Sequence, residues 1–153
     1  PEKHSGCLRY PGLQAQRLFS ETLVPAAGPM IADRLDGEQR VEGLLSVPLL
    51  HDSDSSQWCA WLARAGIRYR PRWQDRRFED YDSVIAAAAA GLGIALLRLP
   101  LARHLLVAGT LRLVHDHAMP NPASHFICMR ESENRLAPSA VAERLLGLAA
   151  GLT

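Results

Sequence analysis

Two short polar segments carry the side chains best suited to binding a small molecule. Their six members can all donate or accept hydrogen bonds: His51, Asp52, Ser53, Tyr81, Asp82 and Ser83. Each segment stands where a helix is expected to begin. A helix N-terminus offers unpaired N–H groups and the positive end of its dipole to an anion. The alternative for both segments is that they only cap the helices that follow them.

Two histidine-containing clusters raise the question of metal binding or catalysis. His51 lies beside Asp52 and Asp54, but no further ligand follows at the i, i+4 spacing of a helical metal site. The sequence His-Asp-His at residues 115–117 is expected at the end of an extended strand. Neighbouring residues of a strand point to opposite faces, so these three side chains cannot lie together on one face. A solvated turn is therefore expected there.

The sequence lacks the motifs of the common enzyme classes. It contains no G-x-S-x-G elbow, no P-loop and no G-x-G-x-x-G fingerprint. Gly91-Leu92-Gly93 lacks the third glycine and follows an expected helix, whereas the dinucleotide fingerprint follows a strand. We therefore predict that the protein is not an enzyme and has no catalytic residue, no metal site and no cofactor.

The composition is that of an ordinary globular domain. Hydrophobic residues make up 48% and charged residues 22% of the 153 positions, which is enough apolar material for a sizeable core. The formal net charge is +1, whereas nucleic-acid-binding modules usually carry a basic face. The arginine-rich stretch 64–77 is interrupted by Pro71 and balanced by neighbouring acidic residues. A solvated loop, and not a DNA contact, is expected for it.

The cysteines and the apolar runs indicate the cellular compartment of the protein. Cys7, Cys59 and Cys128 form no C-x-x-C pair, so neither a disulfide framework nor a zinc site is predicted. Cys59 and Cys128 stand within apolar runs and are expected in the core. No signal-peptide pattern opens the chain and no apolar run approaches a membrane span. A cytoplasmic protein with no membrane partner is expected.

Helices and short apolar strands alternate along the chain. Strands are expected at residues 18–24, 47–50, 67–70, 94–97, 111–114 and 126–129, with a proline-rich turn before the last. Helices are expected to begin at Pro29, near Asp54, at Asp80 or Asp82, at Leu99-Pro100 and near Pro138. This alternation is typical of an α/β domain with a sheet covered on both faces.

Three of these helices have a predictable packing face. Trp58 and Trp61 recur at i and i+3 and are expected in the core. The alanine run 86–90 has no wide side chains and should pack closely against a sheet or another helix. The last helix is expected to bury a stripe of Val141, Leu145, Leu148 and Leu152.

Four segments, taken in order, carry a resemblance to a known family. They are Tyr10-Pro11-Gly12-Leu13 with Arg17–Pro25, Pro48–Asp52 leading to Trp58-x-x-Trp61-Leu62, Phe78–Asp82 followed by Ala87–Leu96, and Gly109-x-Leu111-x-Leu113-Val114 before a strand at Phe126. On these motifs the chain resembles the effector-binding domain of LysR-type transcriptional regulators, especially the branch related to glycine-cleavage and β-lactamase activators. Tyr10 stands where that branch usually has Trp, and residues 27–29 replace its Cys-Ser-Pro.

The resemblance implies an α/β fold of the periplasmic-binding-protein-like (type 2) class, with the second lobe complete and the first lobe partial. Residues 1–25 would form the end of the first lobe and a crossing strand, and residues 26–118 would form the second lobe. Residues 119–153 would supply the returning strand and the C-terminal helix of the first lobe. The family's winged helix-turn-helix and the opening elements of the first lobe are expected upstream of Pro1.

The resemblance also implies a function. In the family a small effector lies in the cleft between two α/β lobes and controls DNA binding by the winged helix. The candidate contacts are then the two polar segments and Phe126, whose strand returns towards the cleft, although a core position is the alternative for Phe126. The expected effector is a small molecule, for which the helix N-termini suit a carboxylate or another anion.

Other partners and other functions follow from the same resemblance. Like subunits are expected, with helix 82–90 as a candidate for subunit packing, and promoter DNA is expected only through the missing N-terminal domain. Two alternatives stay open. The chain is a small-molecule solute-binding lobe with no regulatory role, or it acts only as a dimerisation module.

Overall fold

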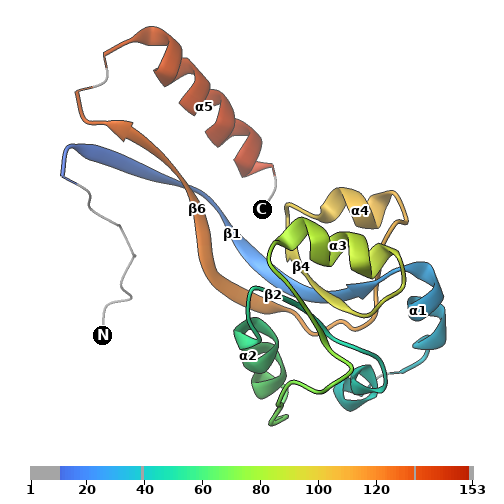
Figure 1. Cartoon of the computed structure of the whole chain (residues 1–153). Helices are drawn as coiled ribbons and strands as arrows, with labels where there is room; N and C mark the ends of the chain where they lie inside the picture. Colours follow the sequence, from blue (N-terminus) through green and yellow to red (C-terminus); the bar gives the residue numbers. More distant parts are fainter. Residues whose placement is uncertain (1–10, 39, 133, 152–153) are drawn as a thin grey trace. The chain divides into compact units, whose positions relative to one another are not determined.

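The computed structural model describes residues 11–38, 40–132 and 134–151. Contacts divide the chain into two units, one made of Pro1–Glu21 with Pro122–Thr153 and the other of Thr22–Asn121. Strands β1 (Leu13–Ala27) and β6 (Met119–Arg130) pair with each other, and each contributes residues to both units (Figure 1).

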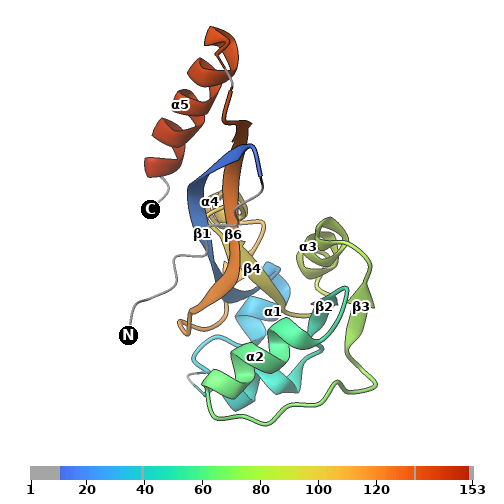
Figure 2. The ribbon, with the colours of Figure 1, turned by 90° about the vertical axis from the view of Figure 1, so that its left-hand side faces the viewer.

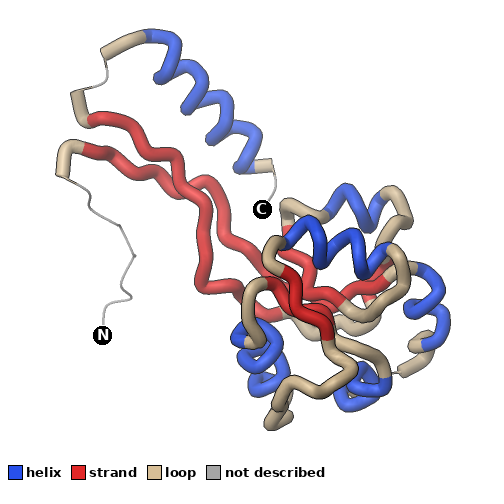
Figure 3. Tube along the Cα trace, in the orientation of Figure 1, coloured by secondary structure: helices blue, strands red, loops and turns tan. Residues whose placement is uncertain are grey.

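The other elements are short, apart from the last helix (Figure 3). The remaining strands are β2 (Leu50–Asp52), β3 (Arg76–Phe78), β4 (Ala95–Leu99) and β5 (Arg112–Leu113). The helices are α1 (Pro29–Arg34), α2 (Ser56–Arg64), α3 (Tyr81–Ala89), α4 (Arg103–Val107) and α5 (Leu136–Ala150), with a 3-10 helix η1 at Val41–Ser46. Among the described residues no helix is both long and apolar enough to cross a bilayer.

Two sheets set the positions of the candidate residues. The larger sheet has the order β4-β1-β5, and both outer strands run antiparallel to β1. The smaller sheet pairs β2 and β3 in parallel, with His51 opposite Arg77 (Figure 2). A parallel bridge between Leu49 and Ile94 lies just before β2 and β4. Because parallel strands end at the same edge, the segments that follow β2 and β3 come close together.

The two tryptophans of α2 are central to the core, as predicted. Trp58 and Trp61 are 2% and 0% exposed, and their rings meet edge to face with centroids 5.6 Å apart. The indole N–H of Trp58 donates to the carbonyl of Leu50 at 2.9 Å. This bond attaches α2 to the strand that carries the first polar segment.

The alanine-rich helix α3 packs closely against the strands, which confirms the prediction for residues 86–90. Ala87 and Ala88 belong to the same buried cluster as Leu97 of β4. The backbone N–H of Gly28 donates to the carbonyl of Ala88 at 3.0 Å. A Cβ atom on Gly28 would lie 2.8 Å from that oxygen, so this approach requires glycine. The C-terminal end of α3 is thereby held beside the end of β1.

Two predictions about strands were wrong. Residues 67–70 form no strand, because the loop that contains them is held by side-chain bonds described below. Strand β6 begins at Met119, so Pro120 and Pro122 lie within a strand where a turn was expected. Prolines two apart lack N–H groups on the same strand edge. Within the described part of the chain β6 pairs only with β1, so its other edge needs no donors.

Two predictions about burial were also wrong. Val141, Leu145 and Leu148 of α5 are 59%, 42% and 61% exposed, while the helix buries Ala142 and Ala149. The unit that holds α5 contains only this helix and parts of β1 and β6 within its described residues, so one helix face stays uncovered. Cys128 is exposed and Cys59 is half-buried, whereas both were expected in the core. The predictions for Cys7 and Leu152 lie outside the described residues.

The substitution Ala88→Leu should destabilise the protein by about 1–3 kcal/mol, because Ala88 is 0% exposed within its buried cluster and a larger side chain would overpack it. Urea unfolding followed by circular dichroism measures the change. Ala86→Leu on the exposed face of the same helix is the matched control and should change the unfolding free energy by about 0.5 kcal/mol or less. Equal losses in the two variants would contradict close packing of α3.

Candidate functional site

The two polar segments predicted from the sequence meet at the carboxyl ends of β2 and β3. The backbone N–H of Ser53 donates to the carbonyl of Phe78 at 2.8 Å, which closes the gap between the strands. Ser53 has a positive φ of 60° and its hydroxyl lies 3.5 Å from the carbonyl of Glu79. The first segment leads into α2 and the second opens α3. Both helix N-termini therefore face the same small region.

Arg98 joins the two segments, although the sequence analysis did not select it. Its guanidinium forms an ion pair with Asp52 and lies 4.3 Å from the centroid of the Tyr81 ring. Its backbone N–H donates to the Tyr81 hydroxyl oxygen at 2.8 Å. The Nε atom of Arg98 is buried and has no hydrogen-bond partner among the described residues. The one signal in the sequence was a single cation within the apolar run 94–99.

The N-terminus of α3 is capped by its own carboxylate. Asp80 accepts the backbone N–H of Ser83 and the Ser83 hydroxyl, both at 2.8 Å. These hydrogen bonds, led by the backbone one, hold the pKa of Asp80 below its usual value. Asp80 is thus the capping residue of the two proposed, and Ser83 contributes its N–H and hydroxyl to that cap. Asp82 is exposed in the first turn.

A second carboxylate lies at the start of α2. Asp54 accepts the backbone N–H of Ser56 at 2.7 Å, and its hydrogen bonds with Ser56 lower its pKa. This bond spans two residues, one fewer than the capping-box spacing that would join Asp54 to Gln57. Asp52 also accepts the Ser53 hydroxyl at 3.1 Å. Carboxylates therefore lie at the start of both helices, Asp54 at α2 and Asp80 at α3.

His51 is connected to a buried polar network that no local sequence pattern indicates. It is 4% exposed, and its Nε2 lies 3.1 Å from the hydroxyl of Tyr69. That hydroxyl donates to Asp75 at 2.6 Å, and Asp75 is also paired with Arg72 at 2.7 Å. Arg72 donates to the carbonyls of Leu45 and Val47. The expectation of a solvated loop for residues 64–77 is therefore wrong at Arg72 and Asp75.

Burial and hydrogen bonding shift the pKa values within this network. Burial lowers the pKa of His51 and raises the pKa of Tyr69. Burial alone would raise the pKa of Asp75, but the bonds from Arg72, the Leu49 N–H and Tyr69 hold it at about 2. The aspartate is therefore ionised and the imidazole is neutral at neutral pH.

The space between the two helix starts is small. His51, Asp52 and Tyr81 line one cavity of about 10 Å³ together with Asp54 and Gln57. A volume of about 10–15 Å³ is the least that holds a water molecule. Three of the predicted residues, His51, Asp52 and Tyr81, are thus brought together around room for a single small group, whereas Ser53, Asp82 and Ser83 do not line it.

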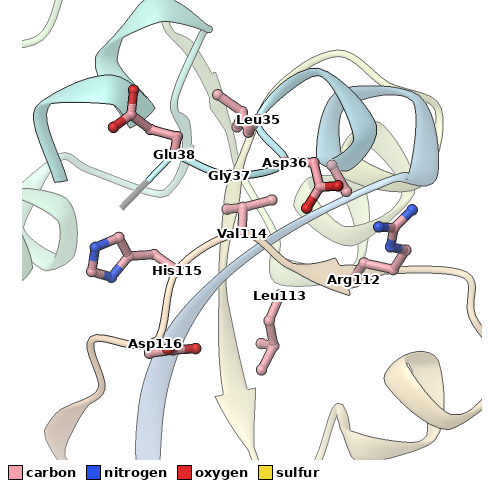
Figure 4. Close-up of a pocket in the computed structure, with 10 residues that line it drawn as sticks. Leu35, Asp36, Gly37, Glu38, Arg112, Leu113, Val114, His115 and Asp116 are labelled. Atoms are coloured by element: carbon pink, nitrogen blue, oxygen red, sulfur yellow. The ribbon is translucent and has the colours of Figure 1, made fainter. Parts of the chain in front are cut away.

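The largest concavity of the same unit lies elsewhere. It has a volume of about 500 Å³ and is lined by residues of the segments that end α1 and contain β5 (Figure 4). None of the predicted contact residues lines it. Its one arginine, Arg112, is already paired with Asp33.

Two other predictions concern residues outside the two segments. His115 and His117 are half-buried against Trp61, with ring centroids 6.2 and 4.9 Å from it, so the solvated turn is confirmed only at the exposed Asp116. No group of three potential metal ligands occurs among the described residues. Phe126 is half-buried on β6, in the unit formed by the two ends of the chain.

The model of the LysR substrate binding domain matches residues 4–150 of this sequence. The chain belongs to that family. The HTH-type transcriptional regulator TrpI of Pseudomonas aeruginosa is 35% identical over 120 residues, which cover 67% of this chain and 41% of TrpI. The glycine cleavage system transcriptional activator of Escherichia coli K12 is 26% identical over 130 residues, which cover 83% of this chain and 42% of the activator. The chain thus spans about two fifths of these relatives, which are transcriptional regulators and not enzymes.

Solved effector domains share the fold. The effector domain of AmpR from Pseudomonas aeruginosa has a TM-score of 0.77 at 23% identity, with 94% of this chain and 68% of that chain covered. The AmpR effector-binding domain from Citrobacter freundii has a TM-score of 0.74 at 20% identity, with 94% and 70% covered. The predicted family and the α/β, periplasmic-binding-protein-like fold class are therefore confirmed. Domains of this family bind small-molecule effectors and act as oligomers in their regulators.

Removal of the Asp75 charge should destabilise the protein strongly. Asp75→Asn leaves the Arg72 guanidinium without its counter-ion, and we expect a loss of about 2–4 kcal/mol in urea unfolding. Asp36→Asn, at an exposed carboxylate, is the control and should change stability by about 0.5 kcal/mol or less. A small effect of Asp75→Asn would mean that the network contributes little to the fold.

The same carboxylate predicts an acid dependence of stability. The folded pKa of about 2 lies below the usual value of 3.8, so the contribution of Asp75 is present above about pH 4 and disappears as the pH falls towards 2. The unfolding free energies of the wild type and of Asp75→Asn should therefore differ at about pH 5 and become equal as the pH falls to about 2.5. Parallel curves for the two proteins would show that Asp75 is not the titrating group.

Proposed function

We propose that this chain is the effector-sensing part of a LysR-type transcriptional regulator that works in the cytoplasm. In this proposal residues 26–118 are the second lobe of the sensing domain, and residues 1–25 and 119–153 contribute to the first lobe. The regulator would contact promoter DNA through a winged helix-turn-helix, and like subunits would pack through the outer face of α3. The family membership supports this proposal, and the Arg98–Asp52 ion pair is the observation on which the proposed anion binding depends.

The proposed effector contacts are the seven residues predicted from the sequence, with Arg98 added as the anion-binding group. The Arg98 side chain is 23% exposed, and Asp52 occupies only part of its donor set. A carboxylate or another small anion would bind the guanidinium with two parallel hydrogen bonds in competition with Asp52. Ser53 and Tyr81 lie beside the same charge and would orient the ligand.

The competition between effector and Asp52 supplies a means of switching. A ligand shifts a conformational equilibrium only by its difference in affinity for the two states. If the effector pulls Arg98 away from Asp52, the ends of β4 and β2 lose the ion pair that joins them. The effector would therefore favour the conformation in which Arg98 has left Asp52.

The experiment is a thermal-shift screen of small mono- and dicarboxylates against the 153-residue chain. Arg98→Gln should remove the stabilisation by every carboxylate that raises the wild-type melting temperature, because it removes the only proposed cation. Arg98→Lys keeps the charge without the planar donor pair, so we expect about tenfold weaker binding. Carboxylates that stabilise Arg98→Gln as well as the wild type, or a screen in which no carboxylate stabilises the wild type, would refute this proposal.

A further inference from the structure

The arginine segment, residues 64–77, has no part in the proposed effector site. It holds six arginines and a single carboxylate, Asp75, so its formal charge is +5 in a chain of net charge +1. The side chain of Asp75 is 3% exposed and is paired with Arg72. The other five arginines are exposed: Arg64, Arg68, Arg70, Arg76 and Arg77. The surface of the segment is therefore positively charged and has no exposed carboxylate of its own.

Alternating burial directs these arginines away from the core. The segment between α2 and β3 runs along the outside of the second unit (Figure 2). Ile67 and Tyr69 pack against the core cluster, whereas Arg68 and Arg70, which alternate with them, are exposed. Of the five exposed arginines, only Arg76 has a side-chain hydrogen bond or ion pair within the described residues. The other four guanidinium groups are free to bind a partner.

An exposed tryptophan stands among these cations. Trp73 is 89% exposed, although tryptophan is highly buried on average. It lies in a turn that the N–H of Asp75 closes by donating to the carbonyl of Arg72 at 3.1 Å. The guanidinium of Arg76 donates to the carbonyls of Trp73 at 3.3 Å and of Gln74 at 2.8 Å. The turn therefore presents an aromatic ring to solvent and keeps a cation beside it.

This combination matches the chemistry of a nucleic-acid strand with unpaired bases. Guanidinium groups bind phosphates with paired hydrogen bonds, and unpaired bases stack on an exposed aromatic ring. Interfaces with nucleic acid are much more positively charged than interfaces between proteins, so five cations favour the former. A bilayer surface fits less well, because Trp73 is the one exposed large hydrophobic residue of the segment.

We propose that the arginine segment is a docking surface for single-stranded DNA, with phosphates on the exposed arginines and one base stacked on Trp73. The sequence alone favoured a solvated loop, because it does not show that Asp75 is buried against Arg72 and leaves the other cations unbalanced. DNA is the expected strand because the relatives of this chain are transcriptional regulators. None of the residues of this surface is among the proposed effector contacts.

Trp73 supplies the signal for the test. The chain has three tryptophans, and Trp58 and Trp61 are 2% and 0% exposed, so a base that stacks on the surface quenches the emission of Trp73 alone. The wild-type chain is titrated with an oligothymidylate of about 15 nucleotides. We expect saturable quenching. For five phosphate contacts the Kd should rise about a hundredfold between about 50 and 200 mM sodium chloride.

Two variants separate the stacking from the charge. Trp73→Ala should weaken binding about tenfold, measured by the anisotropy of a labelled oligothymidylate because the fluorescent side chain is lost. The double variant Arg68→Gln with Arg70→Gln should weaken binding about tenfold and lower the slope of log Kd against log salt by about 1.4. Both arginines are exposed, so the fold should be retained.

The matched control replaces two exposed arginines outside the segment. Arg103→Gln with Arg144→Gln removes the same charge and should change the Kd less than about twofold. Equal losses in the two double variants, or no saturable quenching of the wild type at about 50 mM salt, would overturn the inference.

Other polyanions test the choice of partner. Tighter binding to polyglutamate, to phosphatidylglycerol vesicles, to duplex DNA or to oligouridylate than to oligothymidylate would also overturn it. None of the substituted residues is a proposed effector contact. The oligonucleotide titration can therefore succeed when the carboxylate screen fails, and it can fail when that screen succeeds.

Discussion

The carboxylate of Asp75 accepts hydrogen bonds from the backbone N–H of Leu49, from the Tyr69 hydroxyl and from Arg72, and its side chain is 3% exposed. Leu49 directly precedes β2, whereas Tyr69 and Arg72 belong to the loop between α2 and β3, so one buried charge joins this loop to the start of β2. Without it, Arg72 would be an uncompensated cation among carbonyl groups. The parallel pairing of β2 with β3 and the orientation of His51 both depend on this bond set.

Apolar periodicity was a reliable guide wherever a helix face or a strand packs on the core. The i, i+3 pair Trp58 and Trp61, the alanine run of α3 and the cap at Asp80 were all found from local patterns. The network of Tyr69 and Asp75 was not, because its bonds join residues up to 26 positions apart and no local pattern encodes them. The exposed apolar face of α5 shows a second limit of local patterns. The periodicity of a helix indicates which face is apolar, but it does not indicate whether another element covers that face.

The candidate site has a different polarity from the one that its helix N-termini alone suggest. A free N-terminus attracts anions, but here Asp80 and Asp54 already accept the first backbone N–H groups of α3 and α2. Arg98, which stands on β4 and is paired with Asp52, is therefore the group to which the proposed function assigns the anion. Its exchange of Asp52 for the ligand, and not a free helix N-terminus, would select a carboxylate or another small anion.

Strand β2 connects the two halves of this chemistry. Successive side chains of a strand point to opposite faces, so Asp52 reaches Arg98 while His51 reaches Tyr69 on the other side. The strand has only three residues, and a displacement of Asp52 is not absorbed by a long ladder before it reaches His51. Strand β2 therefore links the Arg98–Asp52 ion pair to the polar network of Tyr69 and Asp75 through two adjacent residues.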